Sequence, residues 1–538
     1  MGRRLTGSRF GVHEPQRLHC KKGSSADKRN SVGSSAQYAS PMRMAFPKAA
    51  SWGLWFVVAA TGCGRQGVEI IGPLPDGGGM GQQPDGGAVA AVCPATLAGR
   101  LTVSEIEVDK DKNIAWQKMG YDQFPVDERV ALAVQPNGQA QLAWAEVNAV
   151  KASDGSQQTP RGVHVTPLDS NLARRADDVV LPTGLEVSGL VAHDDGFALL
   201  TRDQNQGTPI DQGDGNTVAF LVRYQNGQER WKFALTGSES LDAAETLTVY
   251  SPFLEGQLVW NDSTYGAYFV VRGGNGDPQP GFWRDELVFR DSFGRPAPWT
   301  VADGCENNGG IRLIADPGKP NLVSSTWSSL PAMTGLCVQQ TPQEVKLTAL
   351  EADRLVSNQE VGVPGYSGAK FGSLLKIAGG YLVYWLSLGA TNDHQGHDIR
   401  MARLDASFNV VSGPTWLTRT PGIEEWNLHV VPYGPDHFLM VYVEIAITES
   451  AAGNYAMYLG RFVGTHLVLL DANGMPMPDA DDLVQGAPTT ANAEPVILPG
   501  GDVAWPFVNP APDFTQTVDR ANGPGQTTLR IARVRYCQ

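Results

Sequence analysis

Residues 136–147 read PNGQAQLAWAEV, a turn sequence with a central glycine followed directly by a short apolar strand. Pro, Asn and Gly are the residues that build tight turns, because Pro fixes φ and Gly and Asn accept a left-handed backbone. A glycine-bearing turn followed by an apolar strand returns six more times at intervals of about 60 residues. The glycines of the series are Gly138, Gly196, Gly256, Gly318, Gly380, Gly434 and Gly501.

A second series alternates with the first and consists of a strand that runs into a polar turn. Its anchor residues are Leu168, Tyr224, Arg290, Leu350, Leu404 and Leu470. Each unit therefore holds a strand, a Gly turn, a second strand, a polar loop, a third strand, a tight Asp/Asn turn and a fourth strand. Such turns predict consecutive antiparallel hairpins, and Gly and Pro occur too often for long helices.

Repeated four-stranded units of this kind resemble the blades of a β-propeller. The sequence therefore predicts an all-β, seven-bladed propeller-like ring of four-stranded antiparallel blades. It carries no Trp-Asp or kelch signature, so the resemblance is architectural and names no subfamily. The alternative is a pair of β-sandwich domains, which also have short strands and frequent turns.

The two ends of the repeat region predict how the ring closes. The seventh unit ends with TTLRIARVRYCQ at 527–538, its third strand, while the strand GRLTVSEIEV at 99–108 precedes the first unit and has no partner there. We expect this N-terminal strand to complete the last blade. Cys93 and Cys537 would then be neighbours, which predicts a disulfide between them and a second one between Cys305 and Cys337 on the opposite face.

The segment WGLWFVVAATGCGRQ at 52–66 is too short to span a membrane but has the length of the apolar part of a signal peptide. With the positive charges just before it, it resembles a bacterial lipoprotein signal, in which a cysteine after small residues is lipidated. The resemblance implies a signal peptide at 42–62, a lipid on Cys63 and, from Gly64, an outer-membrane lipoprotein. Ala60 stands where such signals usually carry Leu, and the alternative is an ordinary cleaved signal with an incidental cysteine.

Composition divides the rest of the chain. Residues 1–41 are basic and Ser-rich, which predicts disorder and favours a start codon assigned too early. Residues 63–92 are rich in Gly, Pro and Asp and should form a flexible tether to the folded domain at 93–538.

Charge argues against nucleic acid as a partner. The first 62 residues contain 10 Lys+Arg and 2 Asp+Glu of the 42 and 56 in the whole chain, so the remainder has a net charge of −22. A chain this acidic does not attract phosphate backbones. The predicted partners are the membrane, through the lipid anchor, and a carbohydrate or another envelope protein.

The sequence contains no Walker loop, nucleophile elbow, HExxH or CxxC motif. We expect five polar loops to gather on one rim of the ring, where function usually resides. These loops comprise residues 203–216, 261–268, 388–398, 444–455 and 509–526.

Two of these loops could bind metal. Asp393, His394, His397 and Asp398 are suitable ligands for a transition ion. Asp203, Asp211, Asp214 and Asn216 supply the hard oxygen atoms that Ca²⁺ takes. In both loops a solvated polar surface is the alternative, since the first lacks a distant third ligand and the second does not follow the EF-hand order.

Two classes of function remain. The favoured class is a binding protein without catalytic activity that presents its loop rim to a carbohydrate or protein ligand. The alternative is an extracellular hydrolase or lyase acting on polysaccharide, with Asp262, His394 and Glu444 as candidate acid and base residues. Fold alone does not decide between them.

Overall fold

The chain divides into two units, Met1–Gly86 and Gly87–Gln538, and every described residue belongs to the second. The computed structural model describes 93–109, 112–114, 116–117, 127–128, 130–147, 160–204, 217–236, 248–250, 256–273, 283–297, 302–303, 309–314, 322–326, 336–340, 348–349, 370–388, 396–407, 409–450, 458–490, 493–512 and 527–537. Among these residues, no helix has the length and apolar character needed to span a membrane.

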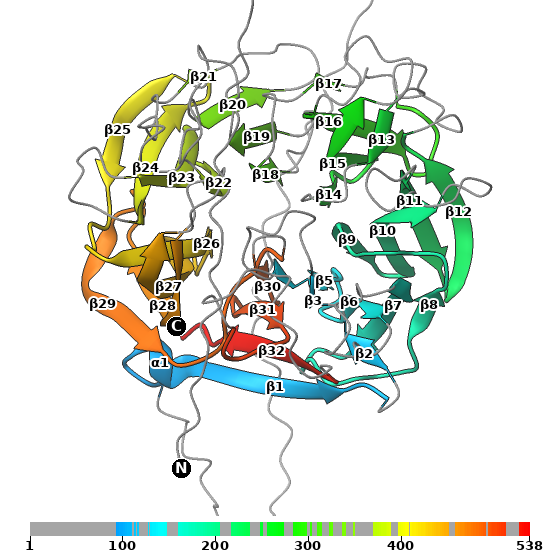
Figure 1. Cartoon of the computed structure of the whole chain (residues 1–538), viewed down its shortest axis with the longest axis horizontal. Helices are drawn as coiled ribbons and strands as arrows, with labels where there is room; N and C mark the ends of the chain where they lie inside the picture. Colours follow the sequence, from blue (N-terminus) through cyan, green and yellow to red (C-terminus); the bar gives the residue numbers. More distant parts are fainter. Residues whose placement is uncertain are drawn as a thin grey trace, which may run out of the picture. The chain divides into compact units, whose positions relative to one another are not determined.

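The described strands form antiparallel sheets arranged in a ring (Figure 1). We name each sheet by its innermost strand. The first four comprise β5 (Val130–Val134), β6 (Ala140–Val147), β7 (Pro160–Leu168) and β8 (Val179–Leu181); β9 (Gly189–His193), β10 (Gly196–Gln204), β11 (Thr217–Gln225) and β12 (Gln228–Ala234); β14 (Gly256–Trp260), β15 (Thr264–Gly273), β16 (Trp283–Asp291) and β17 (Ala302–Asp303); and β18 (Gly309–Ile314), β19 (Leu322–Thr326), β20 (Leu336–Gln340) and β21 (Thr348–Ala349).

The remaining sheets follow the same order of strands. They comprise β22 (Lys370–Ile377), β23 (Gly380–Leu388), β24 (His397–Asp405) and β25 (Val410–Trp416); β26 (Ile423–Pro432), β27 (Phe438–Ser450), β28 (Tyr458–Leu470) and β29 (Pro476–Val484); and β30 (Val496–Ile497), β31 (Val503–Phe507), β32 (Thr528–Val534) and the N-terminal β1 (Leu101–Glu107). A short helix, α1 (Leu97–Arg100), precedes β1, and β3 (Trp116–Gln117) pairs with β4 (Asp127–Glu128).

Contacts between the innermost strands close the ring. β5 contacts β9, β9 contacts β14, and the series continues through β18, β22, β26 and β30 back to β5. The prediction of an all-β propeller built from four-stranded antiparallel sheets is confirmed, and two stacked sandwiches do not describe the chain. Two sheets have a fifth strand, because β2 (Asn113–Ile114) pairs with the far end of β6 and β13 (Thr248–Tyr250) with the far end of β15.

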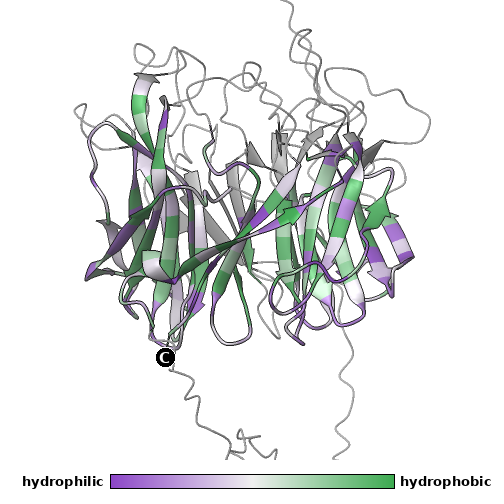
Figure 2. Ribbon diagram, turned by 90° about the horizontal axis from the view of Figure 1, so that it is seen from below, coloured by the Kyte–Doolittle hydropathy of each residue, from purple (hydrophilic) through white to green (hydrophobic). Residues whose placement is uncertain are grey.

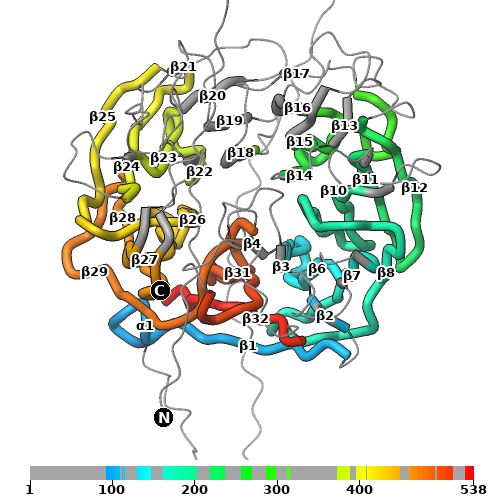
Figure 3. Tube along the Cα trace, viewed as in Figure 1, coloured from blue at the N-terminus to red at the C-terminus, as the bar shows by residue number. Residues whose placement is uncertain are grey.

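The ring is completed by the N-terminal strand, as predicted. β1 pairs with β32 from Leu101↔Val534 to Glu107↔Thr528, so the two ends of the described chain lie side by side (Figures 1 and 3). The Arg530 Nε atom donates to Glu105 Oε1 at 2.9 Å across this pair. The pairing covers the edge of β32 that a last blade of three strands would expose.

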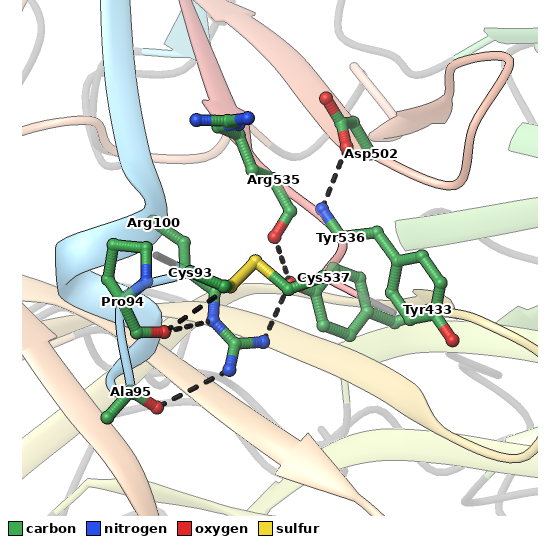
Figure 4. Close-up of a disulfide and its surroundings, with 9 residues drawn as sticks. All are labelled: Cys93, Pro94, Ala95, Arg100, Tyr433, Asp502, Arg535, Tyr536 and Cys537. Atoms are coloured by element: carbon green, nitrogen blue, oxygen red, sulfur yellow. Dashed lines mark hydrogen bonds between the residues drawn. A yellow bond between two sulfur atoms is a disulfide. The ribbon is translucent and has the colours of Figure 1, made fainter. Parts of the chain in front are cut away.

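A disulfide joins Cys93 to Cys537, which confirms the predicted pair; the two Cα atoms are 6.1 Å apart. Arg100 braces this junction through Nε to the Pro94 carbonyl at 2.8 Å (Figure 4). The Tyr536 amide donates to Asp502 Oδ1 at 2.7 Å. Cys337 lies in β20, whereas Cys305 is outside the described residues, so the second pairing stays a prediction.

Repeated turn chemistry explains why the third and fourth strands connect as they do. Asp471 Oδ1 accepts hydrogen bonds from the amides of Asn473 and Met475 at 2.8 and 2.9 Å. A carboxylate in this position replaces the backbone partners that a tight turn leaves unpaired. Three other turns have the same pair of bonds and begin at Asp169, Asp291 and Asp405.

Among the described glycines of the first series, Gly256 departs from the predicted role, and Gly318 lies outside the described residues. Gly256 is the first residue of the innermost strand β14, and the turn to β15 falls at 261–263. A Cβ atom on Gly256 would lie 2.7 Å from Ser188 Cβ, so the glycine allows neighbouring blades to approach closely. Gly138, in contrast, lies in the β5–β6 turn with φ +85°, as the turn prediction requires.

Hydrophobic residues run along the strands and hydrophilic ones gather at the turns and on outer strands (Figure 2). The apolar core lies between adjacent sheets. Trp144 packs with Leu498 and Ile531 of the last sheet, and Tyr442 packs with Leu382 and Met401 of the sheet before it. Each blade therefore buries its apolar faces against its two neighbours, which ties stability to a closed ring.

Candidate functional site

The ring encloses an axial pocket of about 770 Å³. Its walls are the innermost strands β5, β9, β14 and β30, together with the segment that leads into β30. Most of the lining is aliphatic, with Trp260 as its aromatic residue and Gln135, Gln257 and Glu494 as its polar side chains. A concave, largely apolar site of this size with a few polar groups is typical of ligand-binding pockets.

The segment between β29 and β30, which carries Glu494, is anchored to β26. Thr489 and Asn427 of β26 exchange hydrogen bonds of 2.8 and 2.7 Å, and His429 Nε2 donates to the Thr490 carbonyl at 2.6 Å. Burial, and then the nearby Arg312 charge, lower the pKa of His429 to about 3, so the ring is neutral. This anchoring fixes the start of the segment that carries Glu494.

Glu494 reaches from this segment to the blades across the ring. Its Oε1 atom accepts from Gln257 Nε2 at 3.1 Å and lies 3.3 Å from Arg312 Nε. Gln257 Oε1 in turn accepts from the Leu313 amide at 2.7 Å. The Arg312 side chain is 3% exposed and that of Glu494 is 46% exposed, so the carboxylate faces the pocket and the guanidinium lies behind it.

Trp260 forms the aromatic wall and is held by its neighbours. Its ring lies 4.4 Å from that of Tyr265 and meets His193 edge-on at 5.4 Å. Tyr265 Oη and His193 Nε2 are 2.7 Å apart. Burial, assisted by the Arg223 charge, lowers the pKa of His193 to about 4, so this histidine is neutral near pH 7.

A second group of titratable residues lies on the β22 and β26 sheets and extends from the buried His397 and Glu424 to the half-exposed Asp481. His397 Nδ1 pairs with Glu424 Oε1 at 2.8 Å. His466 lies between Glu444 Oε1 at 3.0 Å and Asp481 Oδ1 at 2.6 Å. Burial would lower the pKa of His466, but the hydrogen bonds that its ring donates to these two carboxylates outweigh burial and raise the pKa to about 9.

Glu425 pairs across the strands with Glu444 and is fully buried. Burial raises the pKa of Glu425 well above its usual range, although the hydrogen bond from Thr418 opposes the rise. Two carboxyl groups held close together in different environments are the pattern of acid–base catalysis. These side chains are enclosed between two blades, however, and none of them lines the axial pocket.

The β5 sheet also contains a histidine that stacks on an aromatic ring between two carboxylates. The repetition indicates that this group of residues belongs to the blade architecture. His164 stacks on Trp144 at 4.2 Å and lies between Glu146 at 2.7 Å and Asp178 at 3.3 Å. In the β26 sheet, His466 stacks on Tyr442 at 4.8 Å between its two carboxylates. In both sheets the aromatic residue and the glutamate belong to the second strand, and the histidine to the third.

The structure brings few of the predicted site residues together. His397 and Asp398 are buried at the start of β24, and Asp398 Oδ1 accepts from the Thr420 amide at 2.8 Å. Among the described residues, no group of three or more His, Cys, Asp or Glu side chains is arranged to hold a metal ion. Asp203 lies in β10, and the other predicted ligands lie outside the described residues: Asp393, His394, Asp211, Asp214 and Asn216.

The rim assignment needs two corrections. Glu444 lies inside β27 rather than in a loop, and it is paired with His466. Asp262 lies in the β14–β15 turn with φ +69°, at the end of the blade opposite the loops between second and third strands. The two proposed acid residues therefore belong to different blades, and neither lines the pocket.

The fold and the site define a β-propeller with an axial pocket. No protein-family model matches the chain, and no curated protein matches it either. A protein of unknown function from Dyadobacter fermentans aligns over 80% of this chain and 99% of its own, with 11% identity and a TM-score of 0.36. The GH43 endo-arabinanase from Bacillus licheniformis aligns over 54% and 95%, with 13% identity and a TM-score of 0.26. Likenesses this low carry no argument about function.

Proposed function

We propose that the chain is a lipid-anchored binding protein of the bacterial envelope whose seven-bladed propeller takes a carbohydrate ligand in its axial pocket. Each sheet of four or more strands counts as one blade in this proposal, which the unbroken series of contacts between innermost strands supports. The pocket replaces the loop rim as the proposed site, because it brings an aromatic and several polar side chains together on one concave surface.

Trp260 is the observation that carries the proposal. An indole on the wall of a concave site offers a flat apolar face to the C–H side of a sugar ring, while polar groups nearby take the hydroxyls. Gln135 and Glu494 are such groups on the same pocket. Tyr265 and His193 hold the indole in place before the ligand arrives, which reduces the entropy lost on binding.

The number of carboxylates in the pocket favours binding over hydrolysis. Glycosidases commonly use two carboxyl groups about 5–9.5 Å apart, one on each side of the scissile bond. Among the described residues that line the pocket, Glu494 is the one carboxylate, and its Oε1 atom already pairs with Gln257 and Arg312.

Calorimetry with short oligosaccharides tests the binding function. We expect Trp260→Ala to weaken binding at least tenfold, and Trp416→Ala, on the outer strand β25, to leave it unchanged. Equal affinity of wild type and Trp260→Ala would exclude the pocket as the site. Release of shorter sugars during incubation would instead favour the hydrolase alternative.

The anchor is tested separately. Cys63→Ser should move the protein from the membrane fraction to the soluble fraction, because acyl chains supply about 0.8 kcal/mol for each buried CH₂ group. Unchanged membrane partition would contradict the lipoprotein proposal without affecting the pocket.

A further inference from the structure

Two side-chain acceptors of the axial pocket have no hydrogen-bond partner among the described residues. Gln135 is 3% exposed, and its Oε1 atom has no hydrogen-bond partner among the described residues. Glu494 uses Oε1 for its bonds, and its Oε2 atom accepts none from described residues. Gln257, the remaining polar side chain, already uses both ends of its amide.

Unpaired acceptors on a pocket wall favour a ligand that donates. For the buried Gln135 Oε1 atom, the lack of a partner costs about 1–3 kcal/mol, which a suitable donor on the ligand would recover. An ammonium group has three donors and no acceptor, so it complements these two acceptors more completely than a hydroxyl, which both donates and accepts.

The charges around the pocket also favour a cation. No Lys, Arg or His is among the described residues that line it. Arg312, which offsets part of the Glu494 charge, is buried behind the carboxylate and donates Nε to the Gly372 carbonyl at 2.6 Å. Trp260 adds an aromatic face, and indole is the side chain that attracts cations most strongly.

We propose that the ligand of the axial pocket carries a protonated amino group, as an unacetylated amino sugar does. This inference rests on the proposed carbohydrate-binding function and defines which sugars the pocket selects. Glu494 is the residue that sets the preference, and Gln135 supports it with a neutral acceptor.

The test compares two trisaccharides of the same linkage by calorimetry at pH 6. The trimer of glucosamine carries protonated amines, and the trimer of N-acetylglucosamine is neutral. Wild type should bind the glucosamine trimer at least tenfold more tightly. Glu494→Gln keeps the side-chain shape and should reduce this ratio to about one, whereas Glu105→Gln, on the outer strand β1, should leave it unchanged.

The outcomes separate this inference from the proposed function. Equal affinity for both trimers, or a preference that survives in Glu494→Gln, would overturn the amino-group inference and leave carbohydrate binding intact. Failure to bind either trimer would also overturn the amino-group inference, and calorimetry with other short oligosaccharides decides the binding function separately. If Glu494→Gln does not fold, Gln135→Leu replaces it and should lower the preference at least threefold; an unchanged ratio would count against the inference.

Discussion

Loss of the Cys93–Cys537 disulfide should measurably destabilise the ring. We expect Cys537→Ser to fold and to melt at a lower temperature than wild type, because the bond closes a loop with a sequence separation of 444. In the chain-entropy model a loop of this length restricts the unfolded state by about 6 kcal/mol, a figure that measured disulfides often do not reach.

The expected change in Tm follows from the size of the domain. Unfolding entropy of about 2.1 cal/mol/K per residue gives about 0.9 kcal/mol/K for a domain of roughly 445 residues. A loss of about 6 kcal/mol therefore lowers Tm by about 6 °C. Differential scanning calorimetry of wild type, Cys537→Ser and the double variant with Cys93→Ser measures the change.

Cys63→Ser is the matched control, since it makes the same substitution outside the ring and should leave Tm unchanged. Treatment of wild type with a reductant should reproduce the lower Tm of Cys537→Ser. A decrease below about 1 °C in both experiments would refute the reasoning, because it would mean that the pairing of β1 with β32 alone sets the cost of opening the ring.

Three further predictions concern titration and turns. His466 has a raised pKa of about 9 in the folded state. Its contribution to stability should therefore be complete below pH 6.5 and lost as pH rises through 9. The Tm of His466→Gln should fall less than that of wild type across this range. His429 has a lowered pKa of about 3, so stability should decrease as pH falls from 6.5 towards 3; His429→Gln should show a shallower acid slope in urea titrations, and an identical slope would contradict the assignment. Asp471→Ala removes the acceptor of two turn amides and should cost about 1 kcal/mol in urea unfolding. The exposed Asp436→Ala is its control and should change the free energy of unfolding by less than half as much.

The closure of the ring could be predicted because it left two local signs in the sequence. One was a last unit with three strands, and the other was an unpaired strand at the start with a cysteine beside it. The order of strands followed from turn chemistry, since Asp471 and its counterparts act through bonds to residues two and four positions away. Signals that act over so few residues can be recognised in a single sequence.

The sequence predictions are wrong where one residue type serves two structural purposes. Gly256 was assigned to a turn, yet it is small because neighbouring blades meet there. Glu444 was assigned to a loop because β27 carries polar residues near its end; its partner His466 belongs to the next strand.

The pocket itself had no sequence signal. Gln135, Trp260 and Glu494 come from three separate repeats and meet only through the ring. Neither their spacing nor their immediate neighbours set them apart from other polar and aromatic residues of the repeats.

The disulfide also determines how the domain bears mechanical load. A pull on the chain that precedes Cys93 reaches the covalent link to Cys537 before it reaches β1. The force then divides between β1 and β32, two strands already paired along seven residues. Peeling β1 away from the ring, the easiest way to open a blade closed by its first strand, is therefore blocked at its first step. A protein held to a surface by this end could be dragged by a bound ligand without losing its last blade.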